Sequence, residues 1–176
     1  MIHRETDEAR IERKPLGQFR LFVYGTLKKG FWNHEPFCAS AISIQHATVR
    51  GRLYELPSGI PALEVPKQDI IAHGSADMLE DITMQCRLGV DVPRFLECGG
   101  EGWQQIEGEL IILPNPERTL PPIDRLEGFH PSGASHYIRV LVPVKRSDEC
   151  ITTAWCYVAS SIVSRILTPT FLTRWG

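Results

Sequence analysis

Two stretches of the sequence carry residues whose types and spacing could support chemistry, and the first follows an apolar run. The run Phe19–Val23 is rich in β-forming residues and continues into Tyr24-Gly25-Thr26-Leu27, two lysines and a further glycine. A buried strand that ends in a glycine turn leaves backbone N–H groups without ladder partners, so an anion or a polarised carbonyl is a natural ligand for them. Gly25 also permits a close approach that a side chain would block. Taken alone, such a turn is more often an ordinary strand end with solvated lysines.

The second stretch, later in the chain, carries Glu127. A short helix is predicted over residues 119–127, because Thr119 can cap it, prolines suit its first turn and Gly128 suits its C-terminus. Glu127 then lies at the helix C-terminus, where the helix dipole disfavours a negative charge. This placement predicts a raised pKa for the Glu127 carboxyl and hence a candidate acid or base. The competing interpretation is a solvated glutamate on the surface.

Cysteine and histidine offer a further route to chemistry but show no ordered pattern. The cysteines are five in number: Cys38, Cys86, Cys98, Cys150 and Cys156. They have no CxxC spacing, and with six scattered histidines they show no zinc-ligand rhythm. We therefore expect reduced thiols and no metal site. A cysteine nucleophile paired with His34 or His136 stays open as an alternative.

Composition limits the classes of partner. The chain has 176 residues, 43% hydrophobic and 23% charged, which is ordinary for one globular domain with a real core. A formal net charge of −2 gives no electrostatic case for nucleic acid or an anionic membrane. No apolar window is long enough for a transmembrane helix.

The two ends of the chain differ from its middle. Residues 1–14 are dense in charges of both signs, unlike a signal or transit peptide, so a cytoplasmic location is expected by default. We predict a charged arm over residues 1–18 and a single domain over 19–160. Residues 161–176 are expected to form a terminal helix followed by a loose tail that contains Trp175.

Strand signals dominate the middle of the chain. Alternating or continuous apolar patterns predict strands over residues 47–55, 104–113, 137–144 and 151–158, the last two as an antiparallel pair. Gly51 and Gly108 fall inside two of these strands, which is typical of a bulge, a barrel corner or close backbone approach. With no sustained alternation of strand and helix, the pattern favours an α+β fold, a small mixed β-barrel with a few peripheral helices.

Residues 67–102 differ from the rest. Ile70, Ile71, Met78, Leu79 and Ile82 are spaced loosely enough for a helix, and glycines and a proline divide the segment. We interpret it as an insertion that could lid a pocket, form a dimer contact or remain a mobile loop.

In order along the chain, these motifs resemble those of the γ-glutamylcyclotransferase superfamily, and most closely its γ-glutamylamine cyclotransferase-like branch. The resemblance covers roughly residues 19–65 and 103–158. It rests on Val23-Tyr24-Gly25-Thr26-Leu27-Lys28-Lys29-Gly30 with the Asn33-His34 that follows, Ile106-Glu107-Gly108-Glu109-Leu110, Ile123-Asp124-Arg125-Leu126-Glu127-Gly128, Tyr137-Ile138-Arg139 and Trp155-Cys156-Tyr157.

The resemblance implies conversion of a γ-glutamyl amide or amino acid to 5-oxoproline and a free amine, with no cofactor or metal. Glu127 takes the place of the catalytic glutamate, and Tyr24, Gly25, Thr26 and Leu27 take the place of the substrate-holding loop. Tyr137 matches the tyrosine of the family's Tyr-x-Arg. The implied partner is a small γ-glutamyl molecule, and neither the departing amine nor the oligomeric state follows from the motifs.

The sequence departs from the family pattern in the charged arm, in the length of residues 67–102, and in Pro121-Pro122, where the family runs an unbroken helix into the glutamate. The prolines put the position of Glu127 in question. A non-catalytic module that binds a small carboxylated ligand or a protein on the same fold is the competing hypothesis.

Overall fold

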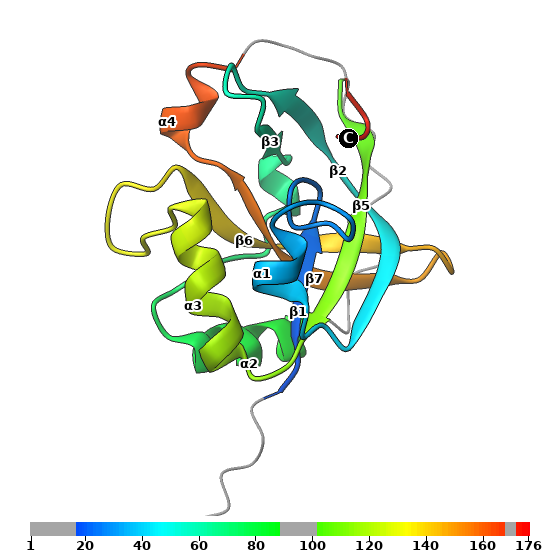
Figure 1. Cartoon of the computed structure of the whole chain (residues 1–176), viewed down its shortest axis with the longest axis vertical. Coiled ribbons are helices and arrows are strands. Elements are labelled where there is room, and N and C mark those ends of the chain that lie inside the picture. The colour runs from blue at the N-terminus through cyan, green and yellow to red at the C-terminus, as the bar shows by residue number, and fades with distance from the viewer. Residues whose placement is uncertain (1–16, 89–101, 168–171) are drawn as a thin grey trace, which may run out of the picture.

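A closed ring of five strands forms the centre of the molecule (Figure 1). The computed structural model describes residues 17–88, 102–167 and 172–176. The ring runs β2–β5–β1–β7–β6 and closes through a β2–β6 pairing, while β3 and β4 extend it at β2 and β6. The strands are β1 (Phe19–Val23), β2 (Ser43–Glu55), β3 (Pro61–Glu64), β4 (Ala72–His73), β5 (Gln104–Leu113), β6 (Tyr137–Arg146) and β7 (Ile151–Ala159). The predicted mixed β-barrel is thus confirmed.

One pairing is parallel and the rest are antiparallel. β1 runs parallel to β7, with Leu21 opposite Trp155, and antiparallel to β5, with Leu21 opposite Ile111. β6 and β7 form the expected antiparallel pair from Tyr137 opposite Ala159 onward. Because β1 pairs on both sides, its C-terminal end, where the predicted loop begins, has a fixed position in the barrel.

Two glycines stand where strands approach closely. A Cβ on Gly108 would lie 2.4 Å from the Val23 carbonyl oxygen, and one on Gly51 would lie 2.7 Å from that of Glu64. Gly51 is also where β2 ends its pairing with β5 and begins its pairing with β3. Both positions therefore need glycine for space, as the strand patterns indicated.

The strands are covered on both faces, which divides the core into two clusters. In β7, Ala154, Cys156 and Val158 belong to the cluster inside the barrel, whereas Trp155 and Tyr157 belong to the cluster between the barrel and the helices. A strand buried on both faces shows a continuous apolar run, which explains the pattern of residues 151–158. In β5 the burial likewise departs from simple alternation, because Ile111 is buried and Ile112 is only partly buried.

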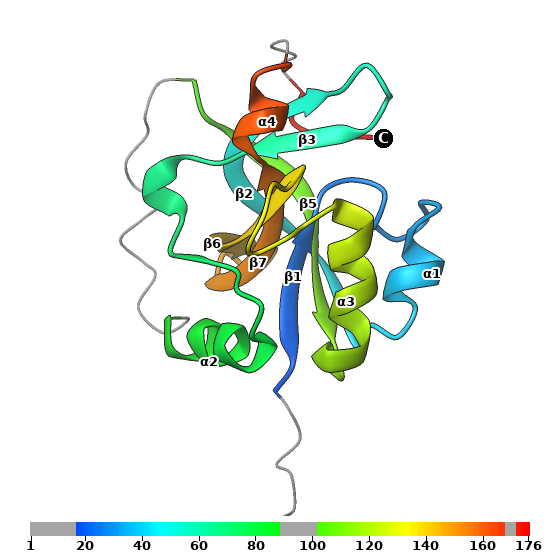
Figure 2. The same cartoon turned by 90° about the vertical axis from the view of Figure 1, so that its left-hand side faces the viewer.

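The helices pack around the outside of the barrel (Figure 2). α1 (His34–Cys38) and α3 (Pro116–Glu127) lie side by side next to β1, α2 (Met78–Leu88) lies near the start of β1, and α4 (Ser161–Ser164) lies at the opposite end. A 3₁₀ turn, η1 (Lys67–Asp69), is tied to β2 by a buried pair in which Arg50 Nε donates to Asp69 Oδ2 at 2.9 Å.

α3 begins earlier than the sequence predicted. Asn115 in the left-handed region, with φ of 46°, precedes Pro116, which occupies the first turn as proline prefers. Thr119 therefore does not cap the helix; its hydroxyl donates to the Pro114 carbonyl oxygen at 3.1 Å instead. Gly128 ends the helix with φ of 61°, as predicted.

Residues 67–88 do not form a single helix; they contain η1, β4 and α2 in turn. Ile70 and Ile71 lie outside any helix, and the Ile71 amide donates to the Leu141 carbonyl oxygen at 2.9 Å, next to β4. α2 is anchored to the barrel because Gln85 accepts from the Arg20 amide at 2.8 Å. Residues 89–101, the other part of the predicted insertion, lie outside the described residues, as does the predicted arm up to residue 16.

The C-terminal segment is not a loose tail. Trp175 is buried and its ring lies 5.2 Å from that of Phe31, and Leu172 forms a bridge with Leu53 of β2. α4 is also shorter than the helix expected after residue 160. No helix in the described ranges is long and apolar enough to cross a membrane.

Candidate active site

The loop that follows β1 presents free backbone donors. Within the described residues, the amides of Gly25, Thr26 and Leu27 donate to no protein acceptor. A Cβ on Gly25 would lie 2.6 Å from Pro61 Cγ, so glycine is required for the loop to pass the start of β3. Both features match the expectation of a loop that can hold an anion or a polarised carbonyl.

Two residues of the α1 region hold this loop in place. The Asn33 side-chain amide donates to Thr26 Oγ1 at 2.9 Å, and the Asn33 backbone amide donates to the Thr26 carbonyl oxygen at 3.2 Å. The buried His34 ring donates from Nδ1 to the Leu27 carbonyl oxygen at 2.8 Å. These bonds turn the loop's carbonyl groups toward α1 and leave its N–H groups free.

Two tyrosines bring buried hydroxyl groups to the same region. Tyr24 donates to the Tyr157 carbonyl oxygen at 2.9 Å, and Tyr137 donates to the Pro61 carbonyl oxygen at 2.9 Å. Burial raises the pKa of both phenols, and the Glu127 carboxyl raises that of Tyr137 further. Both hydroxyls therefore stay protonated near neutral pH and position β3 and β7 around the loop.

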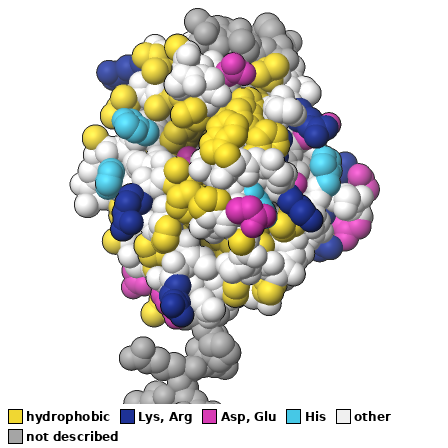
Figure 3. Space-filling model, viewed as in Figure 1, with side chains coloured by type: hydrophobic (Ala, Val, Ile, Leu, Met, Phe, Trp, Pro, Cys, Tyr) yellow, Lys and Arg dark blue, Asp and Glu magenta, His cyan; other side chains and the backbone are white. Residues whose placement is uncertain are grey.

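The Glu127 carboxyl lies between two cavities. A small one, of about 40 Å³, is lined by Phe22, Val23, Tyr24, Gly25, Thr26, Leu27, Ile60, Pro61, Glu127 and Tyr157. A larger one, of about 370 Å³, is lined by Thr26, Trp32, Asn33, Leu56, Ile60, Leu126, Glu127, His136, Tyr137, Val163 and Ile166. Thr26, Ile60 and Glu127 line both, so the two spaces adjoin at the carboxyl group. Figure 3, viewed as in Figure 1 from the side of α1 and α3, shows hydrophobic side chains gathered on that face of the molecule.

The ionisation of Glu127 is set mainly by burial. Desolvation raises the pKa of its carboxyl to about 7, and the nearby Asp124 carboxylate contributes to the rise. The sequence predicted the direction from the helix dipole, but burial is the larger cause. A carboxyl with this pKa can accept and return a proton near neutral pH.

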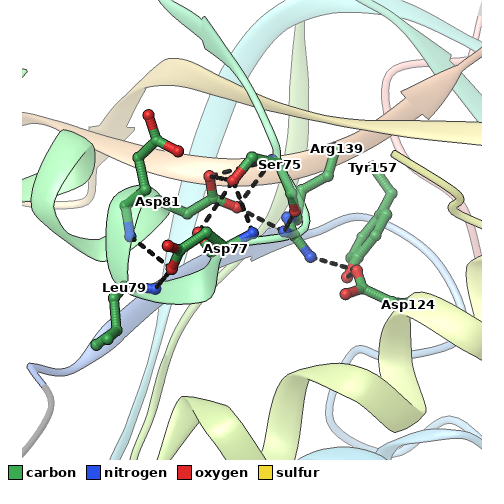
Figure 4. A network of polar contacts seen from close by, with 8 residues as sticks. Ser75, Asp77, Leu79, Asp81, Asp124, Arg139 and Tyr157 are labelled. Carbon is green, nitrogen blue, oxygen red and sulfur yellow. Dashed lines mark hydrogen bonds and ion pairs between the residues drawn. The ribbon is translucent and has the colours of Figure 1, made fainter. Parts of the chain in front are cut away.

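A buried ionic network fixes α3, the helix that carries Glu127, against the barrel (Figure 4). The Arg139 guanidinium of β6 pairs with Asp124 of α3 and, at 2.6 Å, with Asp81 of α2. The Tyr157 hydroxyl of β7 donates to Asp124 at 2.6 Å. The Arg139 side chain also lies against the Phe129 ring at 4.7 Å, so the charge is enclosed by carboxylates and aromatic faces.

The five other residues singled out from the sequence lie around Glu127. Tyr24, Gly25, Thr26 and Leu27 line the small cavity with Glu127, and Tyr137 lines the large one. The internal prolines of α3 do not displace Glu127 from the cavities.

The sequence did not single out five residues that support this arrangement as members of the site. They are Asn33, His34, Asp124, Arg139 and Tyr157. Each of the five belongs to one of the motifs shared with the family, and that membership was the only signal in the sequence for a role in the site. Their contacts join separate elements of the fold, so the motifs could not show them.

The four thiols in the described part of the chain show no sign of nucleophilic chemistry, and Cys98 lies outside it. Burial raises the pKa of Cys38 to about 12 and that of Cys156 well above its usual range. His34 makes its ring hydrogen bond to a backbone carbonyl rather than to a thiol. Cys86 and Cys150 are exposed, and among the described residues no three His, Cys, Asp or Glu side chains gather as a metal site would require.

Several solved structures have the same fold. An AIG2-like protein from Mus musculus, also called GGACT, aligns with a TM-score of 0.54 at 15% identity, covering 90% of this chain and 88% of its own. YkqA from Bacillus subtilis aligns with a TM-score of 0.51 at 20% identity over 90% of this chain, which spans 40% of the length of YkqA. The uropathogenic E. coli protein c4763 aligns with a TM-score of 0.51 at 12% identity, covering 90% of this chain and 93% of its own. These identities establish the fold alone.

Among curated protein sequences, none matches this chain significantly. A family model does match, over residues 21–80 and 72–171, which together span most of the chain and include the loop after β1 and Glu127. By this match, the chain belongs to the family described as gamma-glutamyl cyclotransferase, AIG2-like.

Proposed function

We propose that this protein converts a γ-glutamyl amide or γ-glutamyl amino acid to 5-oxoproline and a free amine, with Glu127 as general acid and base. The observation that carries the proposal is that the Glu127 carboxyl, with a pKa of about 7, and the loop of free amides after β1 line one cavity. Family membership supports the reaction class. The likeness of the quoted motifs to the γ-glutamylamine cyclotransferase-like branch supports an amide substrate.

The reaction needs a base first. The substrate's α-ammonium nitrogen must lose a proton before it can attack the γ-carbonyl carbon and close a five-membered ring. An ionised Glu127 carboxylate accepts that proton, which explains the value of a pKa near neutrality. Because nucleophile and carbonyl belong to one molecule, holding the substrate folded supplies much of the acceleration.

Ring closure places negative charge on the carbonyl oxygen. The free amides of Gly25, Thr26 and Leu27 are suited to donate hydrogen bonds to that oxygen or to the substrate's α-carboxylate. Loss of one donor of this kind typically costs about 2.7–4 kcal/mol in the transition state. In this proposal the hydroxyls of Tyr24 and Tyr137 act by fixing the walls of the site.

The same carboxyl then acts as an acid. Protonated Glu127 gives its proton to the amide nitrogen, the bond from that nitrogen to the γ-carbonyl carbon breaks, and the amine departs. The ring nitrogen retains one hydrogen, and its surplus proton passes through the regenerated carboxylate to the amine. Two protons thus move from the α-nitrogen to the amine, and the enzyme returns to its starting state.

The test is Glu127→Gln, assayed for 5-oxoproline release from a panel of γ-glutamyl amides, γ-glutamyl amino acids and glutathione. We expect activity to be lost, with the melting temperature at about pH 4 nearly unchanged, because there the carboxyl is protonated in the folded and the unfolded chain and the protonated acid and the amide have the same shape. Glu117→Gln, at an exposed glutamate in the first turn of α3, is the matched control and should keep full activity. Unaltered turnover in Glu127→Gln would remove this carboxyl from the mechanism, and stabilisation by γ-glutamyl compounds without product would favour a binding module.

A further inference from the structure

The larger cavity beside Glu127 has a surface different from that of the smaller one. The smaller cavity, of about 40 Å³, has room for about three water-sized groups and is bordered by the free loop amides. The larger, of about 370 Å³, falls within the size range of small-ligand pockets. Since both reach the same carboxyl, a substrate reacting at Glu127 would place one end in each.

Exposed apolar side chains concentrate around the larger cavity. Eight large hydrophobic residues are exposed in the described part of the chain, and four of them line this space: Trp32, Ile60, Leu126 and Ile166. Trp32 is 64% exposed and Ile166 is 62% exposed. Large exposed apolar groups gathered in one place mark a binding surface more often than chance exposure.

The polar groups of this lining are few, and two are already engaged. The Asn33 side-chain amide donates to Thr26, and the Tyr137 hydroxyl donates to the Pro61 carbonyl oxygen. His136 is the one basic side chain among the described lining residues, and its ring is exposed.

No lysine or arginine is present among the described residues that line this cavity. Arg125 and Arg165 precede two of the lining residues in the sequence, but both are exposed and neither lines the space. A carboxylate placed here would lie near the Glu127 carboxyl, without an arginine or lysine partner.

We propose that the larger cavity binds the departing amine and that it selects an apolar alkyl or arylalkyl group without a carboxylate. The preferred substrate is then the γ-glutamyl amide of an apolar primary amine rather than a γ-glutamyl amino acid. This inference rests on the proposed function, because it assigns the second half of the same substrate.

The decisive comparison uses two compounds that differ only in one carboxylate, γ-glutamylphenethylamide and γ-glutamylphenylalanine. Release of 5-oxoproline is measured for both over a range of concentrations. We expect kcat/KM for the phenethylamide to be at least about tenfold higher, with the difference mainly in KM. Equal efficiency, or a preference for γ-glutamylphenylalanine, would overturn the assignment.

A charge placed in the cavity should reverse part of this preference. Ile166→Arg supplies a cation for the carboxylate, and we expect it to reduce the ratio between the two substrates at least about fivefold. Ile162→Arg is the matched control, because Ile162, in α4 shortly before Ile166, is also an exposed isoleucine but lines a separate cavity beside Phe129 and Arg139. The control should leave the ratio unchanged, and an equal effect of both variants would contradict the proposed location.

Binding separates failure of this inference from failure of the proposed function. Calorimetry with Glu127→Gln should show tighter binding of γ-glutamylphenethylamide than of γ-glutamylphenylalanine. The difference in affinity should be smaller than in the wild type, because one negative charge has been removed from the site. Preferential binding by the wild-type protein without any 5-oxoproline would refute the proposed reaction but retain the apolar subsite. Product formation without any preference would retain the reaction and refute the subsite.

Discussion

The proton affinity of Glu127 depends on its surroundings rather than on its position in the sequence alone. Its place at the end of α3, before Gly128, was visible in the sequence and predicted a raised pKa. In the folded protein, burial is the larger cause, with the Asp124 charge second. The pKa of Glu127 is therefore raised as predicted, but its main cause, burial, exists only in the tertiary structure.

This pKa predicts the pH dependence of activity. Glu127 must be ionised to act as a base, so kcat/KM should fall as pH decreases through about 7. A profile of 5-oxoproline release between about pH 5 and pH 9 would measure this limb. An acid limb near the ordinary glutamate pKa would contradict the assignment of Glu127 as the base.

The same shift has a consequence for stability. Because the folded protein raises the Glu127 pKa from 4.5 to about 7, it binds this proton more tightly than the unfolded chain does. The stabilising contribution is complete below the unfolded pKa and is lost as pH rises through about 7. Wild-type protein should therefore lose melting temperature relative to Glu127→Gln as pH rises from about 4.5 to about 7, with little further loss above that.

At the level of elements, the site depends on two supports that join separate parts of the chain. Asn33 and His34, at the start of α1, hold the loop after β1 through Thr26 and Leu27. Arg139 of β6 holds α3 through Asp124. The first support positions the loop amides, and the second positions the Glu127 carboxyl. The geometry between the amides and the carboxyl therefore depends on how α1 and α3 pack beside β1.

Replacement of Asp124 by asparagine tests the second support. Loss of one carboxylate from the buried Arg139 should cost about 3 kcal/mol of folding free energy. Removal of a negative charge near Glu127 should also lower the Glu127 pKa, so the acid limb of the kcat/KM profile should move to lower pH. Thermal melts and the pH profile measure the two effects.

Asp81→Asn is the control, since Asp81 also pairs with Arg139 but lies on α2 and does not contribute to the Glu127 pKa. It should destabilise the protein while moving the acid limb less. If Asp124→Asn leaves the acid limb where the wild type has it, the electrostatic link between the two carboxyls is wrong.

At the level of the whole molecule, the C-terminal residues complete the region around the loop. Trp175 packs against Phe31 and Trp32, and its carbonyl oxygen accepts from Lys28 Nζ at 2.5 Å. Lys28 is buried, contrary to the expectation of a solvated lysine. The loop that begins after the first strand is therefore held in part by the last residues of the chain.

Trp175→Ala should reveal this dependence. Loss of the buried ring should destabilise the protein by about 3 kcal/mol, and a looser Lys28 contact should raise KM roughly fivefold. Trp103→Ala, which removes a ring stacked on Arg52 and lining neither cavity beside Glu127, should lower stability without the change in KM. The same KM in Trp175→Ala as in the wild type would show that the tail does not support the loop.

The sequence by itself determined the five strands of the barrel, though not the short β3 and β4, and the chemical types of the central site residues. Periodic apolar runs predicted β1, β5, β6 and β7, because alternation and β-branching act locally. Gly25, Gly108 and Gly128 indicated close approach or a helix end, and the structure places each where glycine is needed. The motif order predicted the fold, and the family match agrees with it.

Only the tertiary structure decided which groups meet. The helix start at Pro116, the burial of Trp175 and the pairing of Arg139 with both Asp81 and Asp124 depend on contacts between residues far apart in the chain. Periodicity shows which face of an element is apolar but not which other element covers it. The apolar cavity beside Glu127 likewise forms where separate loops and helices converge, so no single stretch of sequence could indicate it.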